Sequence, residues 1–250
     1  LLVGVGVLSL PSILENEIRV AAVQAPLKPP FPINVNPLTE TITEDPAVDV
    51  LFGETGRALE ASASLASTAV TWLANVVTSI PGYSQIAGSD IVFVDIKSGY
   101  REEEVARAFG MALGWTAAEQ TAFLKQVQTS DPELSEGEFV PGTYMMSSAA
   151  SASYVQELLA DRYERDIASR YSPESERVLP LEDVLTIASL LQRETRDPSE
   201  MRLISGIIWN RIFSGMKLQM DATLQYVKGS EVDGWWREVR PEDKKLTSLY

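Results

Sequence analysis

The sequence lacks two residue types that are common in enzyme active sites: its 250 residues include no histidine and no cysteine. The absence of histidine excludes Ser-His-Asp and Cys-His catalysis, imidazole metal ligands and the usual proton shuttle near neutral pH. The absence of cysteine excludes disulfides and thiolate zinc sites, although it does not decide the compartment. If the protein is an enzyme, its acid–base chemistry must therefore use carboxylates, lysine, tyrosine or the backbone.

Positive charge is also scarce. The chain carries 21 lysines and arginines against 35 aspartates and glutamates, which gives a formal net charge of −14. This balance argues against a nucleic-acid-binding protein and against a polybasic membrane-surface protein, because both need a basic face. No P-loop, dinucleotide fingerprint or metal-ligand set is found, so we expect neither a cofactor nor a metal.

The apolar stretch at the N-terminus, "LLVGVGVLSLPSIL", is shorter than the roughly 20 residues that span a bilayer. It could be the end of a transmembrane helix or signal sequence, or a buried strand. We take residues 1–20 as a candidate remnant of a membrane anchor. Residues 24–48 contain six prolines and little periodicity, so residues 21–50 are predicted to form an extended linker.

Two regions are predicted between this linker and residue 147. Residues 51–87 place apolar side chains at helical spacing and are interpreted as a divergent N-terminal helical region. Residues 88–147 are interpreted as a small α/β domain, in which a strand at 90–96 precedes two helices and the strand-like stretch "GEFVPGTYMM". Local signals place the first helix at 101–113 and the capping box "TAAE" at the start of the second.

The last hundred residues, 152–250, are predicted to be mostly helical. One helix begins near Pro180 and carries a stripe at spacings of three, four and three, formed by Val184, Ile187, Leu191 and Glu194. Asp197 is placed to cap a following helix that begins with Pro198 and stops at Gly215. After it, "MKLQM" alternates like a short strand.

Glu194 is the sharpest candidate for chemistry, because it extends an apolar stripe into the last turn of its helix. If that face is enclosed, both desolvation and the negative end of the helix dipole favour the protonated form of a carboxyl there. A protonated carboxyl near neutral pH is what general-acid catalysis requires. The alternative is a helix-terminal glutamate that turns toward water or pairs with an arginine.

A second polar cluster lies in "LQMDATLQY", where Gln219, Asp221, Thr223 and Tyr226 could line one wall of a cleft. The structural alternative is that Asp221 caps a short helix and Thr223 supports it. Asn210 lies in the middle of a predicted helix, where asparagine is unfavourable, and a hydrogen bond to a loop or a ligand contact would explain it. The tryptophans in "GWW" could stack on a sugar or pack in the core.

Taken together, "ASLLQRET", "NRI" and "GMKLQMDAT" resemble the MltG-type (YceG-like) endolytic murein transglycosylases, and so does "EGEFVPGTY". The resemblance covers about residues 90–250. It implies an α+β protein, with a small LysM-like α/β domain at 88–147 and a mostly helical catalytic domain with short strands at 152–250. Because "TSLY" is similar to the start of a further family segment, we expect the catalytic domain to be incomplete at its C-terminus.

The resemblance places the family's catalytic glutamate at Glu194 and its polar cleft residues at Gln219, Asp221, Thr223 and Asn210. The sequence departs from the family pattern at positions near the implied site residues and in the "EGEFVPGTY" stretch: Gln192 replaces Glu, Ala222 replaces Pro, Met220 replaces Thr and Gly142 replaces Asp. With Gln192 in the place of a second acid, Glu194 would act alone.

The implied activity is endolytic cleavage of MurNAc–GlcNAc bonds, with one glutamate as acid and then base, leaving 1,6-anhydroMurNAc ends. The implied partners are peptidoglycan strands and peptidoglycan synthases, and the implied location is the cell membrane, with a single N-terminal span and the catalytic domain outside the cytoplasm. Two alternatives stay open: a non-catalytic peptidoglycan-binding or scaffold protein, and an acidic helical cytoplasmic protein that matches by chance.

Overall fold

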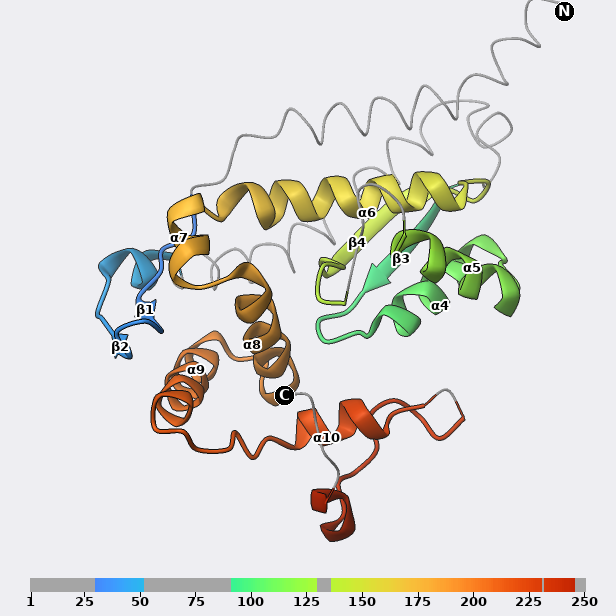
Figure 1. Cartoon of the computed structure of the whole chain (residues 1–250). Coiled ribbons are helices and arrows are strands. Elements are labelled where there is room, and N and C mark those ends of the chain that lie inside the picture. The colour runs from blue at the N-terminus through green and yellow to red at the C-terminus, as the bar shows by residue number, and fades with distance from the viewer. Residues whose placement is uncertain (1–29, 52–90, 130–135, 231, 246–250) are drawn as a thin grey trace, which may run out of the picture. The chain divides into compact units, whose positions relative to one another are not determined.

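The computed structural model describes residues 30–51, 91–129, 136–230 and 232–245, which fall into two compact units. The first unit holds the described residues up to Ser172, apart from the segment from Pro32 to Leu51, and the second unit holds that segment and the chain from Pro173. Figure 1 shows that both contain helices and short strands, which confirms the predicted α+β class. The predicted anchor and nearly all of the predicted helical region at 51–87 lie outside the described residues.

The first unit is built in the order β3 (Ile91–Ile96), α4 (Glu102–Leu113), α5 (Ala117–Val127), β4 (Gly142–Ser147), α6 (Ala152–Asp166) and the short helix η1 (Ala168–Arg170). The two strands pair antiparallel, with Ile91 opposite Ser147 and Ile96 opposite Gly142. The predicted strand and helices are therefore confirmed, although the second strand begins only at Gly142.

One face of this hairpin forms the core of the first unit. The buried side chains of the two strands alternate along the chain, because successive residues of a strand point to opposite faces, and they are Val94, Ile96, Tyr144 and Met146. They pack with Phe109 of α4, Phe123 of α5 and Leu159 of α6, and Figure 1 shows the hairpin lying among these helices. Ile91 and Phe93 point to the other face and are exposed.

Local capping positions α4 and α5. Gly114 ends α4 in the left-handed conformation, with φ of 71°, which glycine adopts without a steric penalty. The predicted capping box then starts α5: the Thr116 hydroxyl accepts from the Glu119 backbone N–H at 3.3 Å, and the Glu119 carboxylate accepts from the Thr116 N–H at 2.7 Å. These hydrogen bonds lower the pKa of Glu119.

The described part of the second unit comprises β1 (Val35–Asn36), β2 (Thr41–Ile42), a helical stretch at 46–51, α7 (Pro173–Val178), α8 (Leu181–Glu194), α9 (Pro198–Phe213), α10 (Asp221–Lys228) and the short helix η2 (Pro241–Lys245). Its core cluster joins Val35, Leu179 and Trp209, with Val184, Ile187 and Phe213 packed against them. Helix α8 lies against both α9 and α10.

The described part of the Pro-rich segment differs from the predicted linker. β1 and β2 form an antiparallel hairpin, and Val35 packs into the core of the second unit beside Trp209. Asp49 also forms an ion pair with Arg202 of α9. Residues 32–51 are therefore a packed part of this unit, because their contacts come from residues more than a hundred positions away, which local periodicity does not report.

The predicted strand at "MKLQM" is wrong. Residues 216–220 have no strand pairing, and Gln219 adopts a φ of 55°. Alternating side chains make a strand only where a partner strand completes the hydrogen-bond ladder. In the described part of the second unit, strand pairing occurs instead between β1 and β2 and at the single bridge from Ser230 to Gly234.

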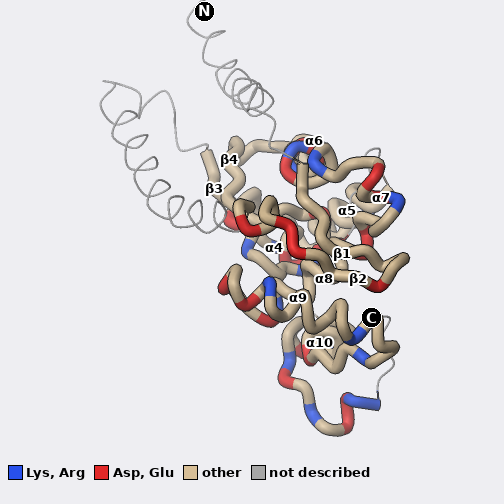
Figure 2. The backbone as a smooth tube through the Cα atoms, turned by 90° about the vertical axis from the view of Figure 1, so that its left-hand side faces the viewer, with Lys and Arg blue, Asp and Glu red and all other residues tan. Residues whose placement is uncertain are grey.

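Residues of opposite charge are mixed along the described chain, and the described helices are not of the kind that crosses a membrane. Lysine and arginine positions are interspersed with aspartate and glutamate positions along the described chain, rather than gathered in one stretch (Figure 2). Among the described helices, none combines the length and apolar character that a membrane crossing requires.

Candidate functional site

Helix α8 places Glu194 at its last position. The helix begins after Pro180, which is its N-cap rather than its first residue, and Thr195 follows in an extended conformation. Leu190 is buried, and Val184 and Ile187 pack against the core of the second unit, as the stripe predicts. Glu194 itself is exposed, so in this structure the apolar face ends before the carboxylate and does not enclose it.

The Glu194 carboxylate has no hydrogen-bond or ion-pair partner among the described residues. Its neighbour Arg193 is directed elsewhere, with the guanidinium carbon 3.7 Å from the ring centroid of Trp236. A partly desolvated cation–π contact contributes about 1–2 kcal/mol, whereas an exposed ion pair contributes about 0–1 kcal/mol. The stack on Trp236 is therefore at least as favourable for Arg193 as pairing with the exposed Glu194.

The turn after α8 is fixed by side-chain hydrogen bonds. The Thr195 hydroxyl donates to Glu200 and accepts from the Asp197 backbone N–H. Asp197 caps α9 by accepting from the Ser199 backbone N–H at 2.8 Å and from its hydroxyl at 2.6 Å, and these bonds hold the pKa of Asp197 below its usual value. The predicted cap is confirmed, but Glu200 bonds to Thr195 instead of completing a capping box.

The polar side chains of the "LQMDATLQY" stretch have different environments: some are exposed to solvent, and one is bonded to the backbone. Gln219 is exposed with a positive φ, and Asp221 is exposed as the first residue of α10, one position after the N-cap. Thr223 is buried, and its hydroxyl donates to the Met220 carbonyl at 2.8 Å. Thr223 therefore holds the first turn of α10 in place, while Gln219 and Asp221 remain available to a ligand.

The remaining two candidates lie on α9 and α10. Asn210 is exposed and lines an open groove along one face of α9 with Ser199, Arg202, Leu203, Gly206 and Ile207. Tyr226 is half-buried on α10. The packing of α8 against α9 and α10 brings the helices of all these candidates together, although no described hydrogen bond joins the Glu194 side chain to any of them.

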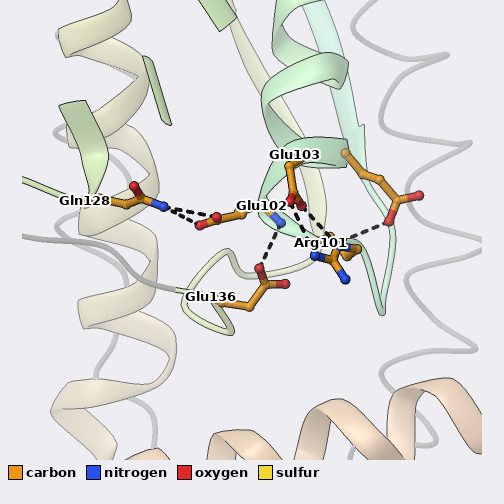
Figure 3. A network of polar contacts seen from close by, with 6 residues as sticks. Arg101, Glu102, Glu103, Gln128 and Glu136 are labelled. Carbon is orange, nitrogen blue, oxygen red and sulfur yellow. Dashed lines mark hydrogen bonds and ion pairs between the residues drawn. The ribbon is translucent and has the colours of Figure 1, made fainter. Parts of the chain in front are cut away.

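A cluster of polar residues that the sequence analysis did not identify lies in the first unit, at the start of α4 (Figure 3). Carboxylate oxygens of Glu102, Glu103 and Glu136 lie within 4.8 Å of one another. Glu136 accepts from the Glu102 backbone N–H at 3.4 Å, Gln128 donates to the Glu102 carboxylate, and Arg101 forms an ion pair with Glu103 at 3.1 Å. Burial, followed by the charge of Glu102, raises the pKa of Glu136 to about 7.

The negative charge of this cluster is partly offset by the guanidinium of Arg101, a residue that is only 8% exposed. Carboxylates at such spacing can hold a divalent cation, but the guanidinium already supplies a positive charge to Glu103. The run of glutamates at 102–104 was a visible signal of the first turn of a helix. Glu136 joins the cluster only through the fold, because 34 positions separate it from Glu102.

The "EGEFVPGTY" stretch packs against α6 through its last residues. Tyr144 is buried and donates to the Val140 carbonyl at 2.6 Å, and burial raises its pKa to about 12. The Arg162 guanidinium lies 4.5 Å from the Tyr144 ring centroid and donates to the carbonyls of Pro141 and Thr143. Gly142 has a φ of 131°, and a Cβ there would lie 2.2 Å from the Arg162 guanidinium. Because side chains other than hydrogen rarely tolerate this φ, glycine is favoured at this position, whereas the Arg162 side chain itself could move aside.

Comparison with known proteins shows which family and which proteins the chain is similar to. A family model described as the YceG-like family matches residues 64–250. Two proteins named endolytic murein transglycosylase, from the D39 and R6 strains of Streptococcus pneumoniae, are each 30% identical over 95 residues. The match covers 38% of this chain and 17% of each relative.

A structural neighbour supports the fold. The crystal structure of a YceG-like protein from Listeria monocytogenes is similar with a TM-score of 0.54 and 17% identity, over 67% of this chain and 61% of that chain. Since the family match extends over most of the sequence and includes parts of both units, the chain belongs to the YceG-like family.

Proposed function

We propose that this chain carries the catalytic part of an endolytic peptidoglycan lytic transglycosylase, with Glu194 as its acid and base. The observation that carries the proposal is the position of Glu194: it is an exposed carboxylate at the end of a packed helix, without a partner among the described residues, in a family whose pneumococcal relatives are named endolytic murein transglycosylases. The absence of histidine from the whole chain leaves a carboxylate as the leading acid–base group.

The proposed reaction needs only one such group. Protonated Glu194 donates its proton to the oxygen of the bond between MurNAc C1 and GlcNAc, and that bond breaks. The resulting carboxylate takes the proton from the MurNAc C6 hydroxyl as that oxygen forms a bond to C1. The products are a GlcNAc end and a 1,6-anhydroMurNAc end, water is not consumed, and Glu194 returns to its protonated form. The second carboxylate of a glycoside hydrolase is not required.

An exposed glutamate becomes a general acid when the substrate covers it. A glycan strand lying over the end of α8 would remove water from the carboxyl, and desolvation favours its protonated form. Gln219, Asp221, Asn210 and Tyr226 offer polar side chains on the neighbouring elements that could orient the sugars. Thr223, the other candidate, would support them through its hydrogen bond in the first turn of α10. Gln192, two positions before Glu194, is half-buried and cannot act as a second acid.

The first unit and the N-terminal region complete the proposal for the whole protein. The β3–α4–α5–β4 order supports a LysM-like module that would bind glycan, and we take residues 88–147 as its extent and 152–250 as the catalytic domain. We further propose that an N-terminal helix in the longer protein anchors it in the membrane with the catalytic domain outside the cytoplasm, where peptidoglycan synthases would be partners.

The test is digestion of purified peptidoglycan strands by the 250-residue chain, followed by mass spectrometry of the ends. We expect 1,6-anhydroMurNAc ends from the wild-type chain and at least a hundredfold slower release from Glu194→Gln, in the range for losing a general acid. Glu182→Gln, an exposed acid in the first turn of the same helix, is the matched control and should retain activity. Anhydro ends released equally by Glu194→Gln would contradict the assignment, and reducing ends would indicate a hydrolase.

Two observations favour a second candidate, a non-catalytic peptidoglycan-binding or scaffold protein. Gln192 occupies the position of the family's second acid, and Glu194 is open to solvent. This candidate predicts that the chain co-sediments with insoluble peptidoglycan but releases no ends of either kind. Sedimentation of wild-type and Glu194→Gln chains should then be equal, and neither should alter the glycan length distribution.

A further inference from the structure

We propose that Trp236 is a positioning residue that holds Arg193 away from Glu194 and so keeps the acid of the reaction without a neutralising cation. This inference rests on the proposed function for its catalytic meaning. The position of the Arg193 side chain against Trp236 can be tested separately, in the folded chain without substrate. Arg193 and Glu194 are consecutive in the last turn of α8, so their side chains leave the helix from neighbouring positions. A long, flexible arginine side chain at this point would otherwise be the closest cation to the carboxylate.

The stack on Trp236 removes that cation. The guanidinium carbon lies 3.7 Å from the indole centroid, well within the roughly 6 Å at which a cation is attracted to an aromatic face. Both side chains are half-buried, so the contact is protected from solvent on part of its surface. Glu194 is exposed and has no partner in the described parts of the chain, as expected if its neighbour is held elsewhere.

The segment that carries Trp236 is itself anchored to α10. Ser230 and Gly234 form a bridge that closes the turn before Trp236. The backbone of Gly229 approaches Trp235 so closely that a Cβ at Gly229 would lie 2.4 Å from the Trp235 carbonyl oxygen. Lys228 donates to the Glu238 carbonyl and forms an ion pair with Asp243. Trp236 therefore lies on a constrained turn and can hold Arg193 in a fixed position.

The other cations on the elements packed against α8 already have partners. Arg202 of α9 pairs with Asp49, Arg211 of α9 donates to the Leu218 carbonyl, and Lys228 of α10 pairs with Asp243. Arg237, next to Trp236, pairs with Asp233 at 3.6 Å. Arg196, in the turn two residues after Glu194, is exposed and is the cation to use as a matched control.

The acidic groups near Glu194 cannot neutralise its carboxylate. On the packed helices they are Glu200, which accepts from Thr195, and Asp221, which is exposed at the start of α10. Asp197 in the intervening turn is committed to capping α9. All three carry the same sign of charge as Glu194, so only the release of Arg193 would add a nearby opposite charge from α8.

The experiment follows the Glu194 carboxyl by ¹³C NMR of the glutamate side chains in the labelled 250-residue chain without substrate. The signal is assigned by its loss in Glu194→Gln. In Trp236→Leu, Arg193 is released and we expect the Glu194 titration midpoint to fall by about half a pH unit, as an exposed ion pair would produce. Trp236→Phe, which keeps an aromatic face, should titrate like the wild type. The double variant Trp236→Leu with Arg193→Gln should return to the wild-type midpoint.

Two single variants test the idea without altering Trp236, in case its replacement prevents folding. Arg193→Gln and Arg196→Gln should both leave the midpoint within about 0.3 pH unit of the wild type. A rise of half a unit or more in Arg193→Gln would mean that Arg193 already acts on Glu194, and it would overturn the proposal. An unchanged midpoint in a folded Trp236→Leu chain would overturn it as well.

The same titration separates this inference from the proposed function. If the midpoint shifts as expected but the wild-type chain releases no anhydro ends, the placement of Arg193 stands and the catalytic assignment is wrong. If the chain is an active transglycosylase, Trp236→Leu should shift the alkaline limb of its pH–activity profile, where Glu194 loses the proton that it must donate, to lower pH by the same half unit. A purely structural role for Trp236 would lower activity at every pH without moving that limb.

Discussion

The Glu136 carboxylate accepts a hydrogen bond from the backbone N–H of Glu102, across 3.4 Å between nitrogen and oxygen. Glu102 is the first residue of α4, so Glu136 satisfies one of the free N–H groups at the start of that helix. The contact joins two segments 34 positions apart in the sequence. Close to Glu102 and Glu103 and removed from water, this carboxylate is placed where its charged form is costly.

The first prediction is that the stability of the first unit falls as pH rises between about 4.5 and 7. The pKa of Glu136 is raised from 4.5 to about 7 in the folded chain, chiefly by burial. Between these values the folded state binds more protons than the unfolded state, so the stabilisation is fully present below 4.5 and is lost above 7. We expect a loss of about 1–2 kcal/mol in the free energy of unfolding, less than the full shift implies because solvent and Arg101 screen the charge.

Urea denaturation at pH 5 and pH 7.5 measures this difference. Glu136→Gln should remove most of it, because the amide is neutral at both pH values. Glu164→Gln, an exposed acid on α6, is the control and should retain the wild-type dependence on pH. An unchanged pH dependence in Glu136→Gln would show that another group is responsible.

The second prediction compares a residue packed against the buried face of the β3–β4 hairpin, Phe109 of α4, with a residue on the exposed face of the hairpin, Phe93 of β3. Phe109 is fully buried and contacts the rings of Phe123 and Tyr144, so Phe109→Ala should lower the free energy of unfolding by about 3–5 kcal/mol. Phe93 is 56% exposed on the opposite face, and Phe93→Ala should cost less than about 1 kcal/mol. Chemical denaturation of both variants checks the contrast. Equal losses would mean that the opposite face of the hairpin is also covered.

The third prediction concerns the start of α5. Thr116→Ala removes the hydroxyl that accepts from the Glu119 N–H, and we expect a loss of about 1 kcal/mol in the free energy of unfolding. Thr116→Ser keeps the hydroxyl and should lose no more than a few tenths of that figure. Thermal or urea unfolding of the pair isolates the hydrogen bond from the change of side chain. A serine variant as unstable as the alanine variant would place the effect outside the cap.

Elements with local signals could be predicted from the sequence. The Thr116–Glu119 box and the Asp197–Pro198 cap depend on residues within four positions of one another, and the structure contains both features. The helix predicted to begin near Pro180 starts at Leu181, with Pro180 as the N-cap, a position that proline fits without losing a hydrogen bond.

Features that depend on distant contacts could not be predicted in this way. The hairpin at Val35 and Ile42 is held by packing on Leu179 and Trp209, and nothing near it in the sequence reports that contact. The periodicity that put Glu194 on an apolar stripe describes one helix alone. Whether the last position of a stripe is covered depends on the elements around it, and here Glu194 is exposed while Leu190 is buried.

The last prediction separates stability from activity at Gln219. Gln219 and Glu40 are the non-glycine residues with positive φ among the described parts of the chain, at 55° and 54°. This conformation costs a non-glycine residue about 1–2 kcal/mol, and glycine avoids the cost while adding freedom to the unfolded chain. Gln219→Gly and Glu40→Gly should therefore each be as stable as the wild type or more stable, by up to about 1 kcal/mol.

The two variants should differ in their release of anhydro ends. Glu40 lies in the turn between β1 and β2, so its replacement should leave the rate unchanged. Gln219 precedes α10 beside Asp221, and its exposed amide is a proposed sugar contact, so Gln219→Gly should slow release while the chain stays folded. A strained backbone conformation lowers stability, and such conformations are found preferentially at functional sites. A Gln219→Gly chain that is both more stable and fully active would remove Gln219 from the substrate-binding residues.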